Sequence, residues 1–134
     1  MIAVLDTGVV VGGIFWRNEP YRCLVALGKR RFTLAVTEPV LDEYVGTVWD
    51  VKREEALALN PEPWLQWLAS CARVVIPSPL PKQTCRDAKD DKFLACALAA
   101  GASLIVSRDQ DLLVLEKPFG IEIVTPRQFL GRLD

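Results

Sequence analysis

The chain contains no histidine among its 134 residues. Ser-His-Asp triads, Cys-His pairs and His-ligated zinc sites all depend on an imidazole side chain. These sites are therefore excluded. General-base chemistry must be carried out by carboxylates, lysine, cysteine or metal-bound water.

Cysteine is scarce, and its spacing is not that of a metal or redox motif. The four cysteines, with no C-x-x-C pair among them, are Cys23, Cys71, Cys85 and Cys96. Three of them lie within helix-like apolar patterns, where free cysteine packs as a small hydrophobic residue. We expect reduced thiols and a cytoplasmic protein, without a disulfide or a zinc site.

Long hydrophobic runs are missing as well. No uninterrupted apolar segment approaches the ~18 residues that a membrane helix requires. The opening sequence MIAVLDTGVVVGGIF has no basic residues before its apolar stretch and carries Asp6 within it, which argues against a signal peptide. A buried first strand is the better interpretation, and no membrane association is expected.

The residues that are present favour a single α/β domain over 1–134, since 51% of them are hydrophobic. Apolar runs predict strands, and periodic segments between them predict helices. The expected strands are 2–5, 32–36, 73–76, 103–106 and 121–124. The first expected helical segment begins at Asp6-Thr7, is interrupted by Gly12-Gly13, restarts after Asn18 and ends near Lys29. The other expected helices are one that begins after Thr37, then 52–59, 62–72, 88–100, 110–115 and one from Pro126. This alternation predicts a three-layer α/β/α fold with a central, mostly parallel sheet.

Four acidic residues that are distant in the chain each adjoin an apolar run: Asp6, Glu43, Asp91 and Asp109. Ligands of parallel sheets collect at the carboxyl ends of the strands, and three of these acids lie at or near such an end. Converging carboxylates raise one another's pKa, so a cluster of them implies a bound cation. Oxygen ligands of this kind suit Mg²⁺ or Mn²⁺.

Each acid also has a simpler interpretation. Asp6 and Asp109 follow strands and can be helix N-caps. Glu43 can be an ordinary exposed helical glutamate, as the neighbouring Asp42 suggests. Asp91 lies in the first turn of a helix, where acids are favoured, and Asp90 and Asp87 are alternatives to it. The simpler interpretations do not explain why all four acids recur where a parallel sheet would gather them.

Three stretches of the sequence resemble PIN-domain nucleases: VLDTGVVVGGIFW, TEPVLDEYVGTV and DAKDDKFLACALAAGASLIVSRDQDLL. Their order and spacing extend the resemblance over nearly the whole chain. The most similar subgroup contains toxins of bacterial toxin-antitoxin pairs. The resemblance implies a Mg²⁺- or Mn²⁺-dependent ribonuclease, a small antitoxin as partner and a homodimer.

Carried over residue by residue, the resemblance places the metal-binding and catalytic acids at Asp6, Glu43, Asp91 and Asp109. It makes Asp111 an accessory acid, and Thr7 and Ser107 the hydroxyl residues that position the first and last acids. The family usually has D-T-N where this chain has Asp6-Thr7-Gly8. A side-chain amide beside the metal is therefore missing, and the Asp6 loop is less fixed.

Cations and aromatic residues near the acids suggest how RNA would be held. Lys92 and Arg108 adjoin the acids in sequence and are expected to bind flanking phosphates. Single-stranded RNA is the favoured substrate, because an open crevice admits splayed nucleotides more readily than a stiff duplex. Four tryptophans can stack on bases or pack in the core: Trp16, Trp49, Trp64 and Trp67. The last three are also the candidate contacts of a homodimer.

Three other functions remain open from the sequence. A metal-dependent phosphohydrolase would need a nucleophilic D-x-D after the first strand, where the chain has Asp6-Thr7-Gly8. A receiver-like signalling domain would need an acidic pair before the first acid. The third alternative is a catalytically weak PIN module that acts through partner binding, which Gly8 in place of the usual asparagine would favour.

Overall fold

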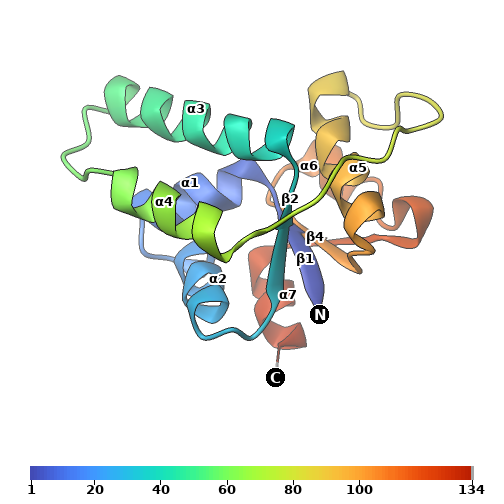
Figure 1. The fold of residues 1–134 in the computed structure, drawn as a ribbon, viewed down its shortest axis with the longest axis horizontal. Coiled ribbons are helices and arrows are strands. Elements are labelled where there is room, and N and C mark those ends of the chain that lie inside the picture. The colour runs from blue at the N-terminus through green and yellow to red at the C-terminus, as the bar shows by residue number, and fades with distance from the viewer. Residues whose placement is uncertain (134) are drawn as a thin grey trace.

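The computed structural model describes residues 1–133. Its centre is a five-stranded parallel sheet with the strand order β3-β2-β1-β4-β5. The strands are β1 (Ile2–Leu5), β2 (Thr33–Val36), β3 (Arg73–Val74), β4 (Leu104–Val106) and β5 (Glu122–Val124). Figure 1 shows the helices arranged around these strands, so the predicted α/β fold with a parallel sheet is confirmed.

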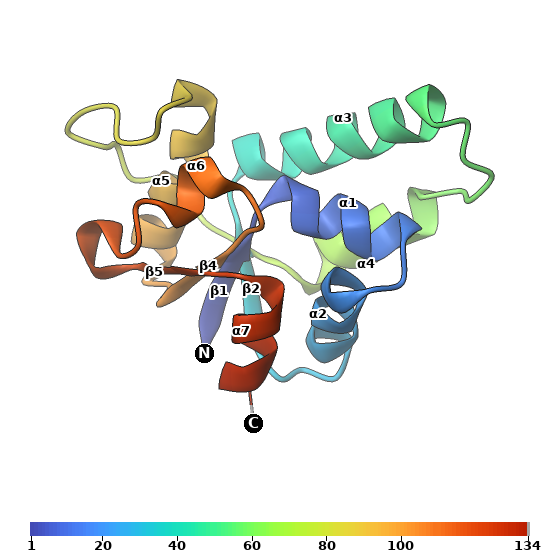
Figure 2. The same cartoon turned by 180° about the vertical axis from the view of Figure 1, so that it is seen from behind.

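The helices cover both faces of the sheet. They are α1 (Thr7–Phe15), α2 (Glu19–Gly28), α3 (Glu38–Glu54), α4 (Glu62–Cys71), α5 (Asp91–Ala100), α6 (Gln110–Leu113) and α7 (Pro126–Arg132). Two short 3-10 turns, Ala88–Asp90 and Pro118–Gly120, precede α5 and β5. Helix α5 packs on β1, β2 and β4 from one side, whereas α7 lies in front of the strands when the molecule is turned around (Figure 2).

The strand order makes the carboxyl ends of β1 and β4 the place where a ligand is expected. The chain builds outward from β1 through β2 and β3 on one side, and through β4 and β5 on the other. The segments that follow β1 and β4 therefore diverge, and parallel sheets bind their ligands at such a place. The register places Leu5 beside Val106, and the Asp6 N–H donates to the Val106 carbonyl at 2.9 Å. Asp6 and Ser107, the next residues, are thus neighbours.

The core explains why these segments form a doubly covered sheet. Ala3, Val4 and Leu5 have no solvent exposure, as expected for a strand that is apolar on both faces. On α5, Phe93 and Leu94 are also fully buried against the sheet. Because Asp90 lies one turn before Leu94, it leaves the helix on the side that faces the strand ends.

Two predicted helix boundaries are wrong. Residues 52–59 do not form a separate helix: α3 continues for 17 residues to Glu54. Ala56 then adopts a φ of 50°, and the Lys52 ammonium donates to the carbonyls of Leu57 and Leu59, which holds the chain in its turn back to α4. Helix α1 also passes through Gly12 and Gly13 without a break.

The two glycines of α1 allow close helix packing. A Cβ atom at Gly13 would lie 2.7 Å from Leu24 Cδ1, so glycine lets α2 approach α1 here.

The third strand is shorter than the expected range 73–76, because only Arg73–Val74 pairs as a strand before Pro77. In the part of the chain that the structure describes, no helix has the length and apolarity needed to cross a bilayer. The four cysteines are free thiols, and Cys71 is the exposed one.

Candidate metal centre at the carboxyl edge of the sheet

Acidic side chains from four different segments lie near one another at the carboxyl ends of β1 and β4. Asp6 follows β1, Asp109 follows β4, Glu43 lies on α3, and Asp90 ends the turn before α5. Burial raises the pKa of Asp6, although hydrogen bonds from Ser107 and the Thr7 backbone oppose this shift. The negative charges of Asp109 and Glu43 raise it further, which shows that these carboxylates lie near one another.

Ser107 connects the acids that follow the two central strands. Its hydroxyl is fully buried and donates to Asp6 Oδ2 at 2.7 Å. The Ser107 Oγ atom also accepts a hydrogen bond from the Asp109 backbone N–H at 2.9 Å. The Asp109 carboxylate in turn caps α6 by accepting the Asp111 N–H at 3.0 Å. A single hydroxyl therefore joins Asp6 to the start of the Asp109 loop, whereas the resemblance implies a contact of Ser107 with the last acid alone.

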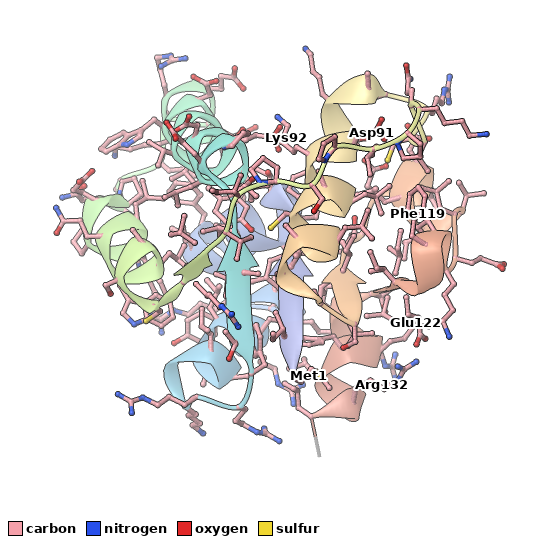
Figure 3. The ribbon with its side chains drawn as sticks, turned by 45° about the vertical axis from the view of Figure 1, so that its right-hand side comes forward. Met1, Asp91, Lys92, Phe119, Glu122 and Arg132 are labelled. Atoms are coloured by element: carbon pink, nitrogen blue, oxygen red, sulfur yellow. The ribbon has the colours of Figure 1, made fainter. Side chains whose placement is uncertain are left out.

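Glu43 is held by two side chains for which the sequence predicts other contacts. Thr7 is expected to position Asp6, but its hydroxyl donates to Glu43 Oε2. Lys92 is expected to bind phosphate, but its ammonium lies 2.6 Å from Glu43 Oε1. The reason is geometric: Thr7 begins α1 and Lys92 begins α5, and both helices pack against α3. Figure 3 shows Lys92 between α3 and α5.

Tyr44 fixes the position of Glu43 relative to the sheet. Its fully buried hydroxyl donates to the carbonyl of Leu5, the last residue of β1. Burial raises the pKa of Tyr44 well above its usual value, and the nearby Asp6 and Glu43 carboxylates add to this shift. Helix α3 is thereby attached to the strand end that carries Asp6.

At the start of α5, the acid that faces the cluster is Asp90. Burial raises its pKa to about 6, and the charges of Asp6 and Asp109 are the next largest causes. The neighbouring Asp91 has a different environment: its carboxylate accepts the Cys85 N–H at 2.7 Å and the Thr84 N–H at 3.1 Å. Asp91 thus binds the preceding loop. The sequence predicts that Asp91 lies with Asp6, Glu43 and Asp109, but the structure does not bring it together with them. The reason is that consecutive helical residues point about 100° apart.

The remaining predicted site residues surround the acids. Asp111 lies in the first turn of α6, with Arg86 Nη1 3.8 Å from its carboxylate. Arg108 is exposed, and its guanidinium lies along α1 so closely that a Cβ atom at Gly12 would be 2.8 Å from it. Trp16, at the end of α1, is 44% exposed. Trp64 and Trp67 pack edge to face with centroids 5.8 Å apart.

The chemistry of the donors fits a hard divalent cation. All four groups offer carboxylate oxygens, and their mutual repulsion is the condition that a cation relieves. In residues 1–133, however, no three acidic, cysteine or histidine side chains are grouped closely enough to hold one ion. Lys92 provides the positive charge beside Glu43 instead. Cation binding therefore requires side-chain rotations that draw the carboxylates inward.

The pKa shift of Asp90 predicts how the stability of the metal-free protein depends on pH. A raised folded-state pKa means that the folded protein binds more protons than the unfolded chain between the two pKa values. Stability should therefore fall as pH rises from the ordinary value of 3.8 to about 6. The loss should be about 1 kcal/mol after allowance for solvent screening. Melting curves in EDTA across this range, compared between wild type and Asp90→Asn, measure it. If the stability of the two proteins depends on pH in the same way, burial and neighbouring charges do not raise the pKa of Asp90.

Gly8 offers a second test of the site. It is exposed, and a Cβ atom there would have no heavy atom within 4 Å, so the asparagine that the PIN resemblance leads us to expect would fit without a clash. We expect Gly8→Asn to raise Mn²⁺ affinity about fivefold, equivalent to one added hydrogen bond of about 1 kcal/mol. Gly8→Ala, which fills the position without an amide, is the matched control. Equal affinities of the two variants for Mn²⁺ would remove any role for an amide here.

Comparisons with known proteins show the family of the chain and the fold that it shares with solved structures. The PIN domain model matches residues 3–111, a span that contains all of the acids described above. PAE2754 from Pyrobaculum aerophilum has a similar structure, with a TM-score of 0.66 and 18% identity over 99% of this chain and 89% of that chain. VapBC2 from Rickettsia felis, bound to a DNA fragment from its promoter, gives a TM-score of 0.60 and 21% identity over 92% of this chain and 97% of that chain. No curated protein sequence matches the chain. The resemblance noted from the sequence is confirmed, and the chain belongs to the PIN domain family.

Proposed function

We propose that this protein is a ribonuclease that hydrolyses RNA phosphodiesters with Mg²⁺ or Mn²⁺ at the acid cluster. The observation that carries the proposal is the convergence of Asp6, Glu43, Asp90 and Asp109 at the carboxyl ends of β1 and β4. These acids come from segments that are distant in sequence, and two of them share the buried Ser107. No capping role requires such a convergence.

The residues divide into those that hold the cation and those that position them. Asp6, Asp90 and Asp109 would hold it directly, together with Glu43 once Lys92 releases that carboxylate. A cation at this position lowers the pKa of a water molecule and offsets charge on the phosphate. Ser107 orients Asp6, and Thr7 orients Glu43. Asp91 has a different role from the one that the resemblance implies: it anchors the loop before α5 and so fixes the acid next to it.

Positive charge lies beside the acids. Arg108 is exposed beside Asp109 and is available to hold a phosphate that flanks the scissile bond. Lys92 would change partner in this scheme: a Glu43 carboxylate that held a cation would no longer need the Lys92 ammonium, which would then be available to bind phosphate. A single strand of RNA is favoured over a duplex, because splayed nucleotides reach acids at the strand ends more readily than a stiff helix does.

A cleavage assay on the pure protein tests this proposal. Single-stranded RNA should be cut in Mg²⁺ or Mn²⁺ and left intact in EDTA, and Asp6→Asn should be inactive in both. An aryl phosphate monoester included in the same assay identifies a phosphohydrolase, which would cleave the monoester but not RNA. Specific partner binding without cleavage of either compound would identify a PIN module with little catalytic activity.

We further propose that the protein is the toxin of a toxin-antitoxin pair, acts in the cytoplasm and forms a homodimer. The support is the subgroup resemblance, the four free thiols and the partly buried tryptophans Trp49, Trp64 and Trp67. The last two line an apolar groove between α2 and α4. Sedimentation equilibrium at micromolar concentration should give the mass of a dimer, and co-expression with a small upstream reading frame should relieve growth arrest. A strictly monomeric mass would refute the homodimer, and unrelieved arrest would refute the pairing.

A further inference from the structure

A groove runs along α5 next to the acid cluster. One wall is the connector that follows β3, and the other wall is the first half of α5. Its volume is about 560 Å³, within the range of small-ligand sites. The lining residues include Pro77, Pro79, Leu80, Lys82, Lys92 and Ala95. Figure 3 shows the connector crossing in front of α5 toward Asp91.

The outer wall of the groove is fixed at both ends. At one end, the Ser78 N–H donates to the carbonyl of Ala95 in α5 at 3.2 Å. At the other end, the Asp91 carboxylate accepts backbone N–H groups from Thr84 and Cys85. Prolines at positions 77, 79 and 81 limit the backbone between these two attachments. The groove is therefore formed before any ligand arrives, which lowers the entropic cost of binding.

The groove is continuous with the acid cluster through Lys92. The Lys92 side chain lines the groove, and its ammonium also contacts Glu43. A strand whose phosphate lies over the acids would thus pass Lys92 as it enters the groove. The apolar groove between α2 and α4 has no such link to the acids, because Lys92 is not among its lining residues.

The chemistry of the lining suits a nucleotide. Pro79 and Leu80 provide an apolar surface against which a base can lie, and Lys82 places an exposed ammonium at the rim. The Lys82 side chain forms no ion pair within the described residues 1–133. Asp91 is the acid among the lining residues, and its oxygens are already engaged by the Thr84 and Cys85 N–H groups. A flat apolar group joined to a phosphate satisfies both parts of this surface.

We propose that this groove binds the nucleotide next to the scissile phosphate of single-stranded RNA. The base lies against Pro79 and Leu80, and its phosphate is held by Lys82. The inference rests on the proposed ribonuclease function and extends it from the reacting phosphate to the neighbouring nucleotide. It also gives Asp91 a functional consequence, because the wall that Asp91 anchors is the wall that carries Lys82.

Binding of a short fluorescein-labelled RNA of mixed sequence in EDTA tests the phosphate contact without cleavage. Loss of one phosphate contact in Lys82→Gln should reduce the slope of log affinity against log salt by about 0.7. At 0.1 M salt this corresponds to an affinity about fivefold weaker than that of wild type. Lys29→Gln is the matched control, because Lys29 ends α2 ahead of β2, at the amino edge of the sheet. It should leave both quantities unchanged.

Photocrosslinking locates the base. RNA with a thiouridine next to a cleavage-resistant phosphate should crosslink within residues 77–83. If wild type cuts RNA but Lys82→Gln retains the full salt slope, or the crosslinks map only to other faces, the groove assignment is overturned and the nuclease function stands. If wild type neither binds nor cuts RNA, the proposed function fails and the groove assignment fails with it.

Discussion

Asp90→Asn is expected to reduce RNA cleavage by about 100-fold or more, since it removes a carboxylate that would hold the cation beside the reacting phosphate. Asp91→Asn should cost only about tenfold, the effect of a group that orients its neighbours. The reason is the different orientation of these adjacent side chains. Asp90 faces Asp6 and Asp109, whereas the Asp91 carboxylate is engaged by the Thr84 and Cys85 N–H groups. Titration calorimetry with Mn²⁺ measures the corresponding loss of affinity.

Thermal melts in EDTA provide the control, because the two variants should shift stability in opposite directions. Asp90→Asn removes charge repulsion and should raise the melting temperature. Asp91→Asn keeps one acceptor oxygen but turns an amide toward a backbone N–H, which should cost about 1–2 kcal/mol. Cys85 is buried in the wild-type protein. In Asp91→Asn it should become reactive toward a thiol reagent, as measured in a Cys71→Ser background. Loss of cation binding in Asp91→Asn alone would return Asp91 to the metal site.

Ser107→Ala is expected to lower both cation affinity and cleavage by about 10- to 100-fold, although Ser107 itself need not touch the cation. The hydroxyl joins Asp6 Oδ2 to the Asp109 backbone, and alanine removes both hydrogen bonds at once. Asp6 would then have one hydrogen bond fewer to oppose the rise in its pKa caused by burial. Its carboxylate would be both less fixed and more readily protonated.

Ser103→Ala is the matched control for this variant. Ser103 precedes the same strand at its opposite end and is exposed, so its hydroxyl is remote from the acids. The free energy of unfolding of each variant should lie within about 1 to 2 kcal/mol of the wild-type value. If Ser107→Ala binds Mn²⁺ as tightly as Ser103→Ala does, Ser107 serves only the fold.

The fold and three of the acids could be predicted because their signals are local. Each central strand is a short apolar run, and Asp6 and Asp109 come directly after such runs. Parallel strands align their carboxyl ends, so chain position alone brings these acids together. Glu43 is a nearly local case, because the adjacent Tyr44 is apolar enough to be buried and its hydroxyl binds the end of β1.

The choice between Asp90 and Asp91 could not be made from the sequence. Both acids precede the same apolar helix, and a difference of one residue turns a side chain by about 100°. The choice depends on Thr84 and Cys85, whose N–H groups bind Asp91 from a loop without regular structure. The ion pair between Lys92 and Glu43 spans 49 residues and likewise has no local signal.

The helix boundaries that differ from prediction show the same limit. Residues 52–59 have good helical propensity, but Lys52 binds the Leu57 and Leu59 carbonyls and holds that segment in a turn. Gly12 and Gly13 look like a break in the sequence, yet in the structure they allow α2 to pack closely on an unbroken α1. In the first case a side-chain contact within the segment overrides the local preference, and in the second case a contact between two helices does so.

The most direct measurement of the central claim is anomalous diffraction from crystals of the protein soaked in Mn²⁺. We expect a single peak or a close pair of peaks bound directly by carboxylate oxygens of Asp6, Asp90 and Asp109, with Asp91 still bonded to Thr84 and Cys85. Lys92 should have moved away from Glu43. A peak on Asp91, or no peak at saturating Mn²⁺ with Lys92 still paired to Glu43, would contradict the account.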